Sequence, residues 1–222
     1  MQVLAIGNSF SQDATAYLKK ISELGKGDIT VVNLFIGGCP LSRHYRNMLS
    51  GERAYSMEFN GQSTGFFVSL DDALLSRDWD VVTIQQASPA SPDYDTYQPY
   101  LDRLAEYIRE CCPKAKLMIH ETWAYEEGSD RLLKLAGFEK RVDMYNDLHA
   151  AYVQAVQNIN ADGIIPSGTI MQKLIENGIT PIKRMGQPED IANCVISVAN
   201  GNFDFCTGTV IDCDGGFNVR IL

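Results

Sequence analysis

The stretch Gln2-Val3-Leu4-Ala5-Ile6-Gly7-Asn8-Ser9-Phe10-Ser11 decides the fold of this chain. Its first residues form a short apolar run, which predicts a strand over residues 2–6. A polar turn follows, and residues 13–24 then carry apolar side chains at helical spacing up to Gly25, a residue that suits a helix end. A strand, a tight turn and a helix in this order are typical of the start of an α/β domain with a parallel sheet.

The rest of the chain repeats this alternation of short apolar runs and amphipathic stretches. Asn60-Gly61 favours a hairpin turn between residues 55–59 and 65–69, because both of its residues tolerate a positive φ. We therefore predict a three-layer α/β/α fold with a mostly parallel sheet and a small β-hairpin inserted at its edge. The other predicted strands are residues 29–34, 81–84, 116–120 and 163–166, and the other predicted helices are 70–76, 97–111 and 142–159, with Ser69 and Asp72 as a capping box.

Composition excludes several classes of partner. The 222 residues are 45% hydrophobic and carry a formal charge of −9, which disfavours binding to nucleic acid or to an anionic membrane. No apolar run approaches the roughly 20 residues that span a bilayer. The chain starts without the basic and long apolar segments of a signal peptide. We expect a cytoplasmic protein, or a secreted one if a leader precedes this numbering.

Cysteine and histidine usage does not indicate a metal site or disulfides. Six cysteines are scattered without a C-x-x-C pair, and there are three histidines. We expect reduced cysteines packed as small apolar side chains, with neither a metal nor an organic cofactor.

Ser9 lies at the carboxyl end of the first predicted strand and directly before a helix. This edge of the sheet is where α/β proteins bind ligands, and a helix N-terminus favours developing negative charge. Asn8-Ser9 before a helix is also an ordinary N-cap signal. The local sequence leaves both interpretations open.

Several blocks, in order, resemble the SGNH (GDSL-like) hydrolases. Residues 7–11, Gly-Asn-Ser-Phe-Ser, resemble the G-D-S-L block, with Asn for Asp and Phe for Leu. Residues 36–41, Ile-Gly-Gly-Cys-Pro-Leu, resemble the oxyanion glycine block, and Trp79-Asp80 through Ser88 occupies the third block. Residues 120–125 and 161–168 resemble a bacterial branch of unassigned function. The resemblance covers about residues 1–178 and implies a flavodoxin-like sheet.

This resemblance implies hydrolysis of a small ester, for example an acetylated carbohydrate, with Ser9 as the nucleophile. The backbone N–H groups of Ser9 and Gly38 and the side-chain amide of Gln86 would hold the oxyanion. Gln85 competes with Gln86 for this role, because a slip of one residue reverses the side-chain direction on a strand.

The general base that this superfamily uses is missing. Its D-x-x-H block near the C-terminus does not occur here, and no histidine follows His149. His120, which closes a predicted strand, and His44, which follows the glycine block, are the candidate substitutes. His149 lies within a predicted helix, where we expect a structural role. Without a base the activity would be impaired, and the alternative is a non-catalytic binding protein of the same fold.

From about Pro181 the sequence resembles a different family. Residues 184–192, Arg-Met-Gly-Gln-Pro-Glu-Asp-Ile-Ala, and 206–216, Cys-Thr-Gly-Thr-Val-Ile-Asp-Cys-Asp-Gly-Gly, resemble the end of short-chain dehydrogenase/reductases. The resemblance implies a fusion of a hydrolase-like domain, 1–178, with a tail, 179–222, that adds a helix starting near Pro188 and a strand. The tail would pack on its own chain or form a homodimer.

The tail alone does not make the chain an oxidoreductase. The turn after the first strand lacks the glycines of a dinucleotide loop, and no Tyr is followed four residues later by Lys. The positions of Asp212 and Asp214 in the sequence do not assign either residue to a catalytic triad.

Overall fold

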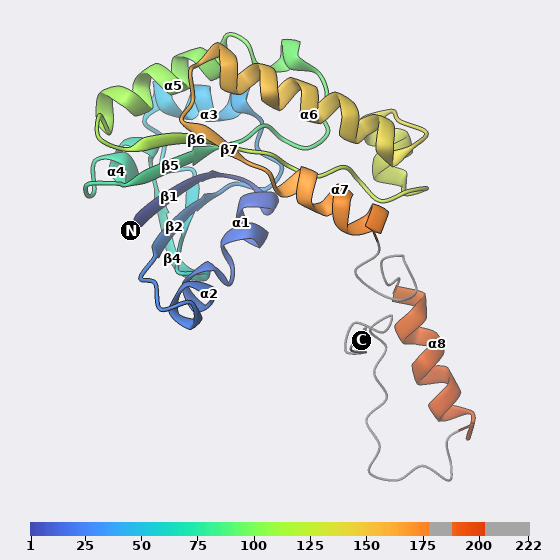
Figure 1. Ribbon diagram of the computed structural model, residues 1–222. Helices are drawn as coiled ribbons and strands as arrows, with labels where there is room; N and C mark the ends of the chain where they lie inside the picture. The colour runs from blue at the N-terminus through green and yellow to red at the C-terminus, as the bar shows by residue number, and fades with distance from the viewer. Residues whose placement is uncertain (178–187, 203–222) are drawn as a thin grey trace. The chain divides into compact units, whose positions relative to one another are not determined.

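The computed structural model describes residues 1–177 and 188–202 (Figure 1). It divides into two compact units, Met1–Thr169 and Ile170–Leu222. The division falls earlier in the chain than residue 178, the boundary expected from the sequence. The first unit holds the whole sheet and every residue discussed below as a candidate site.

Among the described residues, seven strands form one mixed sheet in the order β4-β3-β2-β1-β5-β6-β7. The parallel strands are β1 (Gln2–Gly7), β2 (Thr30–Phe35), β5 (Val81–Ile84), β6 (Lys116–His120) and β7 (Gly163–Ile165). The antiparallel hairpin of β3 (Tyr55–Phe59) and β4 (Gln62–Val68) extends the sheet beyond β2. The predicted α/β fold, its strands and the edge hairpin are confirmed.

The order of the parallel strands, β2-β1-β5-β6-β7, is flavodoxin-like. In this topology the connections leave β1 and β5 in opposite directions along the sheet. Ile6 of β1 pairs with Ile84 of β5, so Gly7 and Gln85 follow side by side at the carboxyl edge. Ligands bind α/β sheets at this switch point, and the candidate site lies here.

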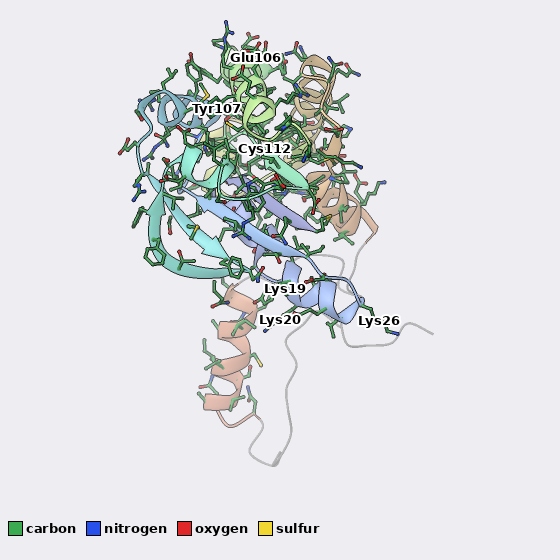
Figure 2. All side chains as sticks on the ribbon, turned by 90° about the vertical axis from the view of Figure 1, so that its left-hand side faces the viewer. Lys19, Lys20, Lys26, Glu106, Tyr107 and Cys112 are labelled. Carbon is green, nitrogen blue, oxygen red and sulfur yellow. The ribbon has the colours of Figure 1, made fainter. Side chains whose placement is uncertain are left out.

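Helices cover both faces of the sheet (Figure 1). On one face lie α1 (Ser9–Thr15) and α2 (Leu18–Leu24), and on the other α3 (Leu41–Ser50), α5 (Tyr100–Cys111) and α6 (Arg141–Asn158). Figure 2 shows the two sides, with Lys19, Lys20 and Lys26 around α2 and Glu106 and Tyr107 on α5. The remaining helices include α4 (Leu70–Leu74), which starts with the predicted capping box, a π-helical turn (Arg131–Ala136), a 3₁₀ turn (Tyr94–Tyr97) and α7 (Ser167–Asn177).

The two faces of the sheet differ in polarity. Leu4, Ile6 and Ile84 belong to the main apolar core, together with residues of α3, α5 and α6. Because side chains alternate along a strand, the neighbouring positions face the side of the sheet on which α1 lies. Several of these are buried and polar, among them Asn33, Thr83, Gln85 and His120.

Buried polar contacts fix α1 on this second face. Ser11 Oγ donates to Asn33 Oδ1 over 2.8 Å, and Asn33 Nδ2 donates to Glu58 Oε2 over 2.8 Å. Gln12 Nε2 donates to the other carboxylate oxygen of Glu58. These contacts join α1 to β2 and β3, so the first turn of α1, which carries Ser9, has a defined position.

The single helix predicted over residues 13–24 is wrong in its start and in its continuity. The helical turns begin at Ser9 and break between α1 and α2. Thr15 Oγ1 donates to the Ser11 carbonyl over 2.8 Å, a contact that bends helices. The hairpin turn also reaches this break, since a Cβ on Gly61 would lie 2.2 Å from the Ala16 carbonyl oxygen.

In the tail, α8 (Pro188–Ala199) begins at the proline where the sequence predicts a helix. The predicted tail strand, Cys206, Cys213, Asp212 and Asp214 lie outside the described residues. The cysteines that the structure describes, Cys39, Cys111, Cys112 and Cys194, are free thiols. Within 1–177 and 188–202, no group of three or more metal-ligating side chains gathers, and no helix has the length and apolar character to cross a bilayer.

Candidate active site

Ser9 is exposed at the first position of α1, directly after β1. Asn8 is the N-cap, and its Oδ1 accepts a hydrogen bond from the Phe10 N–H over 3.1 Å. The cap therefore belongs to Asn8 and does not use Ser9. The Ser9 hydroxyl has no hydrogen-bond partner among residues 1–177 and 188–202, so it is free to meet a ligand.

Asn8 also joins the turn after β1 to the turn after β2. Its Nδ2 donates to the Cys39 carbonyl over 3.2 Å. Cys39 closes the glycine turn through its own N–H, which donates to Ile36 O over 3.2 Å. Ser9 and Gly38 each directly neighbour a member of the Asn8–Cys39 pair, so their backbone N–H groups lie at the same part of the edge.

The backbone conformation at position 38 favours glycine. Its φ is +60°, in the left-handed region that residues with a Cβ rarely adopt, and a Cβ there would meet nothing within 4 Å. Gly38 is also exposed. The glycine turn thus presents open backbone beside Ser9.

A continuous chain of hydrogen bonds runs from Asn8 across the carboxyl ends of β1, β5, β6 and β7. Gln85 Nε2 donates to Asn8 Oδ1 over 2.7 Å. Gln85 Oε1 lies 2.6 Å from His120 Nδ1, and His120 Nε2 lies 3.0 Å from Ser167 Oγ. We call this chain, Asn8–Gln85–His120–Ser167, the edge relay.

A backbone donor fixes the direction of every bond in the edge relay. Asn8 Oδ1 must face the Phe10 N–H, because a backbone N–H can only donate. The same oxygen accepts from Gln85 Nε2, which turns Gln85 Oε1 toward His120. His120 Nδ1 therefore carries the proton, and His120 Nε2 accepts the hydroxyl proton of Ser167. Burial lowers the pKa of His120 to about 4, so the ring is neutral at neutral pH.

Two glycines allow the edge relay to form. A Cβ on Gly7 would lie 2.6 Å from Ser11 Oγ and 2.9 Å from Gln85 Cδ, so a side chain would displace the glutamine amide. A Cβ on Gly168 would lie 2.2 Å from the Thr122 carbonyl oxygen. Only glycine lets α7 start this close to the segment after β6.

Gln86, the expected oxyanion donor, is used for other contacts. Its Oε1 accepts from the Leu41 N–H over 3.0 Å and the Ala87 N–H over 2.8 Å. Its Nε2 donates to the Thr96 carbonyl and to Thr96 Oγ1, both over 3.1 Å. Both amide protons and the amide oxygen are therefore occupied, and Gln86 anchors the start of α3. Gln85 is the glutamine that is bonded to the Ser9 turn, through Asn8.

His44, the second expected substitute base, is fully buried in α3. Its Nδ1 lies 3.0 Å from the Tyr55 hydroxyl, and the two rings stack. Burial lowers the pKa of His44 to about 3. The structure does not hydrogen-bond His44 to Ser9.

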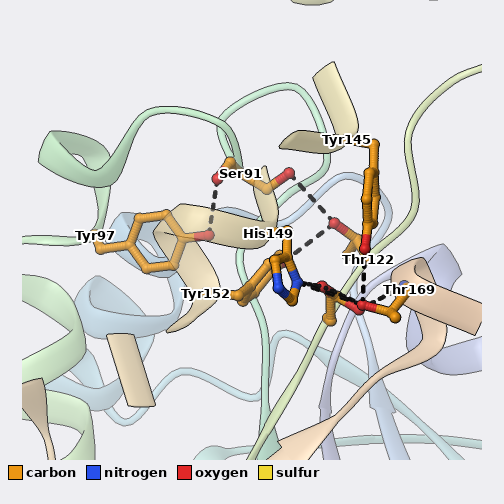
Figure 3. A network of polar contacts seen from close by, with 8 residues as sticks. Ser91, Tyr97, Thr122, Tyr145, His149, Tyr152 and Thr169 are labelled. Atoms are coloured by element: carbon orange, nitrogen blue, oxygen red, sulfur yellow. Dashed lines mark hydrogen bonds and ion pairs between the residues drawn. The ribbon is translucent and has the colours of Figure 1, made fainter. Parts of the chain in front are cut away.

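A carboxylate–histidine pair next to the edge relay was missed by the sequence-based assignment, which gave His149 a structural role. His149 Nδ1 donates to Glu121 Oε1 over 2.7 Å. Glu121 is fully buried, whereas the His149 side chain is 43% exposed. Figure 3 shows His149 beside Thr169 and Tyr145. The Thr169 N–H donates to the other Glu121 oxygen over 2.7 Å, and Tyr145 stacks on the His149 ring. The position of Glu121 directly after β6 was the one feature of the sequence that could have indicated this pair.

An aromatic contact borders Ser9. The Phe10 and Trp123 rings have centroids 4.3 Å apart and are tilted by 57°. Phe10 follows Ser9 and Trp123 lies two residues after Glu121. This contact joins the first turn of α1 to the segment after β6.

A model of a domain of unknown function, DUF4886, matches residues 2–186. The chain belongs to the DUF4886 family. A solved DUF4886 family protein from Bacteroides uniformis is 36% identical, with a TM-score of 0.73, over 79% of this chain and 70% of that one. No protein with a curated description matches.

Two further solved structures share the fold of this DUF4886 protein. One is a proposed SGNH hydrolase from Slackia heliotrinireducens, 24% identical, with a TM-score of 0.51 over 73% of this chain and 77% of that one. The other is a proposed GDSL-like lipase from Parabacteroides merdae, 12% identical, with a TM-score of 0.51 over 80% of this chain and 82% of that one. The chain has the SGNH hydrolase fold.

Proposed function

We propose that this DUF4886 protein hydrolyses small carboxylic esters at the carboxyl edge of its sheet, with Ser9 as the nucleophile. One observation carries the proposal: in an SGNH hydrolase fold, the Ser9 hydroxyl is exposed and unbonded at the first turn of α1. The open N–H of Gly38 and the helix N-terminus beside it support the assignment, because both favour an oxyanion.

In the proposed reaction, Ser9 Oγ adds to the ester carbonyl carbon and loses its proton to solvent. The backbone N–H groups of Ser9 and Gly38 stabilise the resulting oxyanion. Collapse of this intermediate breaks the carbon–oxygen bond and releases the alcohol, which takes up a proton. Water then attacks the acyl-enzyme, releasing the carboxylic acid and restoring the Ser9 hydroxyl.

Turnover by this route is slow. In the part of the chain that the structure describes, no histidine hydrogen-bonds to Ser9. A serine hydrolase site that lacks triad members retains about 10³–10⁴-fold catalysis over water from its oxyanion donors and from binding. We expect the rate of ester hydrolysis at Ser9 to exceed the uncatalysed rate by about this factor.

A ligand-binding protein without turnover is the second candidate function. The observation that favours it is the state of His120, whose two ring nitrogens are both engaged, by Gln85 and Ser167. A reductase has no such support, because buried Asn8 and Gln85 side chains fill the turn where a dinucleotide loop would lie.

Hydrolysis of p-nitrophenyl acetate by the wild type, Ser9→Ala and Ser63→Ala distinguishes these functions. Ser63 is an exposed serine on β4 and serves as the matched control. The ester hydrolase predicts turnover by the wild type and the control, and a clearly lower rate for Ser9→Ala. Equal background rates for all three would favour the binding function.

A further inference from the structure

Among residues 1–177 and 188–202, Ser167 is the serine that hydrogen-bonds to a histidine. Its Oγ lies 3.0 Å from His120 Nε2, and the opposite ring nitrogen of His120 lies 2.6 Å from Gln85 Oε1. A serine, a histidine that accepts its proton, and a third group that orients the histidine are the parts of an activated nucleophile. These three residues come from α7, β6 and the end of β5.

The direction of the bonds is correct for activation. The edge relay places the proton of His120 on Nδ1, so Nε2 offers a lone pair to the Ser167 hydroxyl. Gln85 cannot reverse this arrangement, because its own Nε2 is held by Asn8 Oδ1. The histidine is therefore locked in the tautomer that can accept a proton from Ser167.

The position of Ser167 also favours attack on a carbonyl or phosphoryl centre. Ser167 is partly exposed and is the first residue of α7, an eleven-residue helix. The positive end of a helix dipole stabilises an oxyanion that forms beside it. Gly168 lets the helix start close enough to β6 for the serine to reach His120.

We propose that Ser167, activated by His120 and oriented through Gln85, is a second nucleophilic serine that reacts with activated carboxylic esters and with phosphonofluoridates. With an ester, the Ser167 Oγ–carbon bond forms as the proton moves from Oγ to His120 Nε2. The carbon–oxygen bond to the leaving group then breaks, and the proton of His120 Nε2 passes to the departing alkoxide. With a phosphonofluoridate, the Oγ–phosphorus bond forms as the phosphorus–fluorine bond breaks; fluoride leaves, and the proton on His120 Nε2 passes to solvent.

His120 is neutral at neutral pH and so begins in the form that a base requires. Its low pKa makes it a weak base, because proton transfer is most efficient when the pKa lies near the working pH. Reaction at Ser167 is therefore slow, and covalent capture is a better readout than turnover.

This second site is independent of Ser9. Ser9 has an open hydroxyl without a histidine, whereas Ser167 has a histidine and is less exposed. We expect each serine to react when the other is replaced by alanine, so each can be tested in the absence of the other.

The test is labelling of the whole chain with a fluorophosphonate probe, followed by intact-mass measurement and peptide mapping. The variants are Ser167→Ala, Ser9→Ala, the exposed control Ser63→Ala and His120→Gln, with circular dichroism to confirm that each is folded. We expect the adduct on Ser167 in the wild type, in Ser9→Ala and in Ser63→Ala, and its loss in Ser167→Ala. His120→Gln should slow labelling of Ser167 by about 100-fold, the low end of general-base contributions.

Other outcomes overturn the inference. An adduct on Ser9 alone would leave the proposed hydrolase site standing and remove the second nucleophile. Labelling of Ser167 at the rate of Ser63, or no labelling of Ser167, would also contradict it. If His120→Gln does not fold, the labelling rates of Ser167 and Ser63 in the wild type still show whether Ser167 is activated.

Discussion

Gln85 donates its side-chain amide to Asn8 over 2.7 Å and thereby joins the turns after β5 and β1 at the switch point of the sheet. This contact makes Asn8 part of three interactions, since the same side chain caps α1 and bonds to the Cys39 carbonyl. The conformation of the Ser9 turn thus depends on one asparagine side chain.

Asn8→Ala should destabilise the protein by about 2–4 kcal/mol, because it removes a cap and leaves buried polar groups unpaired. Asn8→Asp keeps an oxygen that accepts from Phe10 and Gln85 but turns its second oxygen toward the Cys39 carbonyl, so we expect it to be destabilising too. Urea unfolding of both variants measures the difference. Equal stability of wild type and Asn8→Ala would show that these contacts do not hold the turn.

Gly168→Ala should disrupt the start of α7. Its Cβ would lie 2.2 Å from the Thr122 carbonyl oxygen, so either the Thr122 segment or the start of α7 must shift, and we expect the Ser167–His120 bond to weaken. We expect a loss of about 1–3 kcal/mol, as for overpacked core positions. Gly37→Ala is the matched control, because its Cβ would meet only Phe35, at 3.9 Å. Similar melting temperatures for the two variants would contradict this account.

Stability should fall as the pH is lowered below 6.5. Burial depresses the folded-state pKa of His120 to about 4 and of His44 to about 3, below the unfolded value of 6.5. Between pH 6.5 and about 4 the unfolded chain binds these two protons and the folded chain does not. The slope therefore approaches about 2.7 kcal/mol per pH unit, about 1.36 for each histidine.

Urea unfolding at several pH values between 7 and 5 measures this slope. His44→Phe keeps a ring at the buried position and should remove about half of the pH dependence. A free energy of unfolding that is constant over this range would show that the two rings are not buried in neutral form.

Glu121→Leu should destabilise the protein by about 1–3 kcal/mol, because the Thr169 N–H and His149 Nδ1 lose their buried acceptor. Gln154→Ala, at an exposed position of α6, is the control and should be close to neutral. Thermal unfolding of both variants checks this expectation. A stable Glu121→Leu variant would mean that the buried carboxylate makes no net contribution.

The strands could be predicted because each is a short apolar run with clear ends. The bounds of β5 and β6 agree with the predicted residues 81–84 and 116–120. In contrast, α3 was missed, because His44 and Asn47 are among its few buried residues and hide the apolar period. Its position becomes clear only from its packing against α5.

The site could be predicted in part. The places of Ser9 after β1 and of Gly38 after β2 agree with the predicted positions, whereas their roles rest on the resemblance to SGNH hydrolases and stay a prediction. The edge relay could not be predicted, because Gln85, His120 and Ser167 come from separate segments and meet through side-chain directions. The Glu121–His149 pair was missed for the same reason, since the two residues are far apart in the chain.

The central claim is that Ser9 accepts an acyl group from a small ester. The most direct measurement is to incubate the protein with p-nitrophenyl acetate, quench with acid and map acetylation by peptide mass spectrometry, with Ser9→Ala and Ser63→Ala in parallel. This account predicts an acetyl group on Ser9 in the wild type and in Ser63→Ala, which hydroxylamine removes. A wild-type protein with Ser9 unmodified, while p-nitrophenol release equals that of Ser9→Ala, would contradict it.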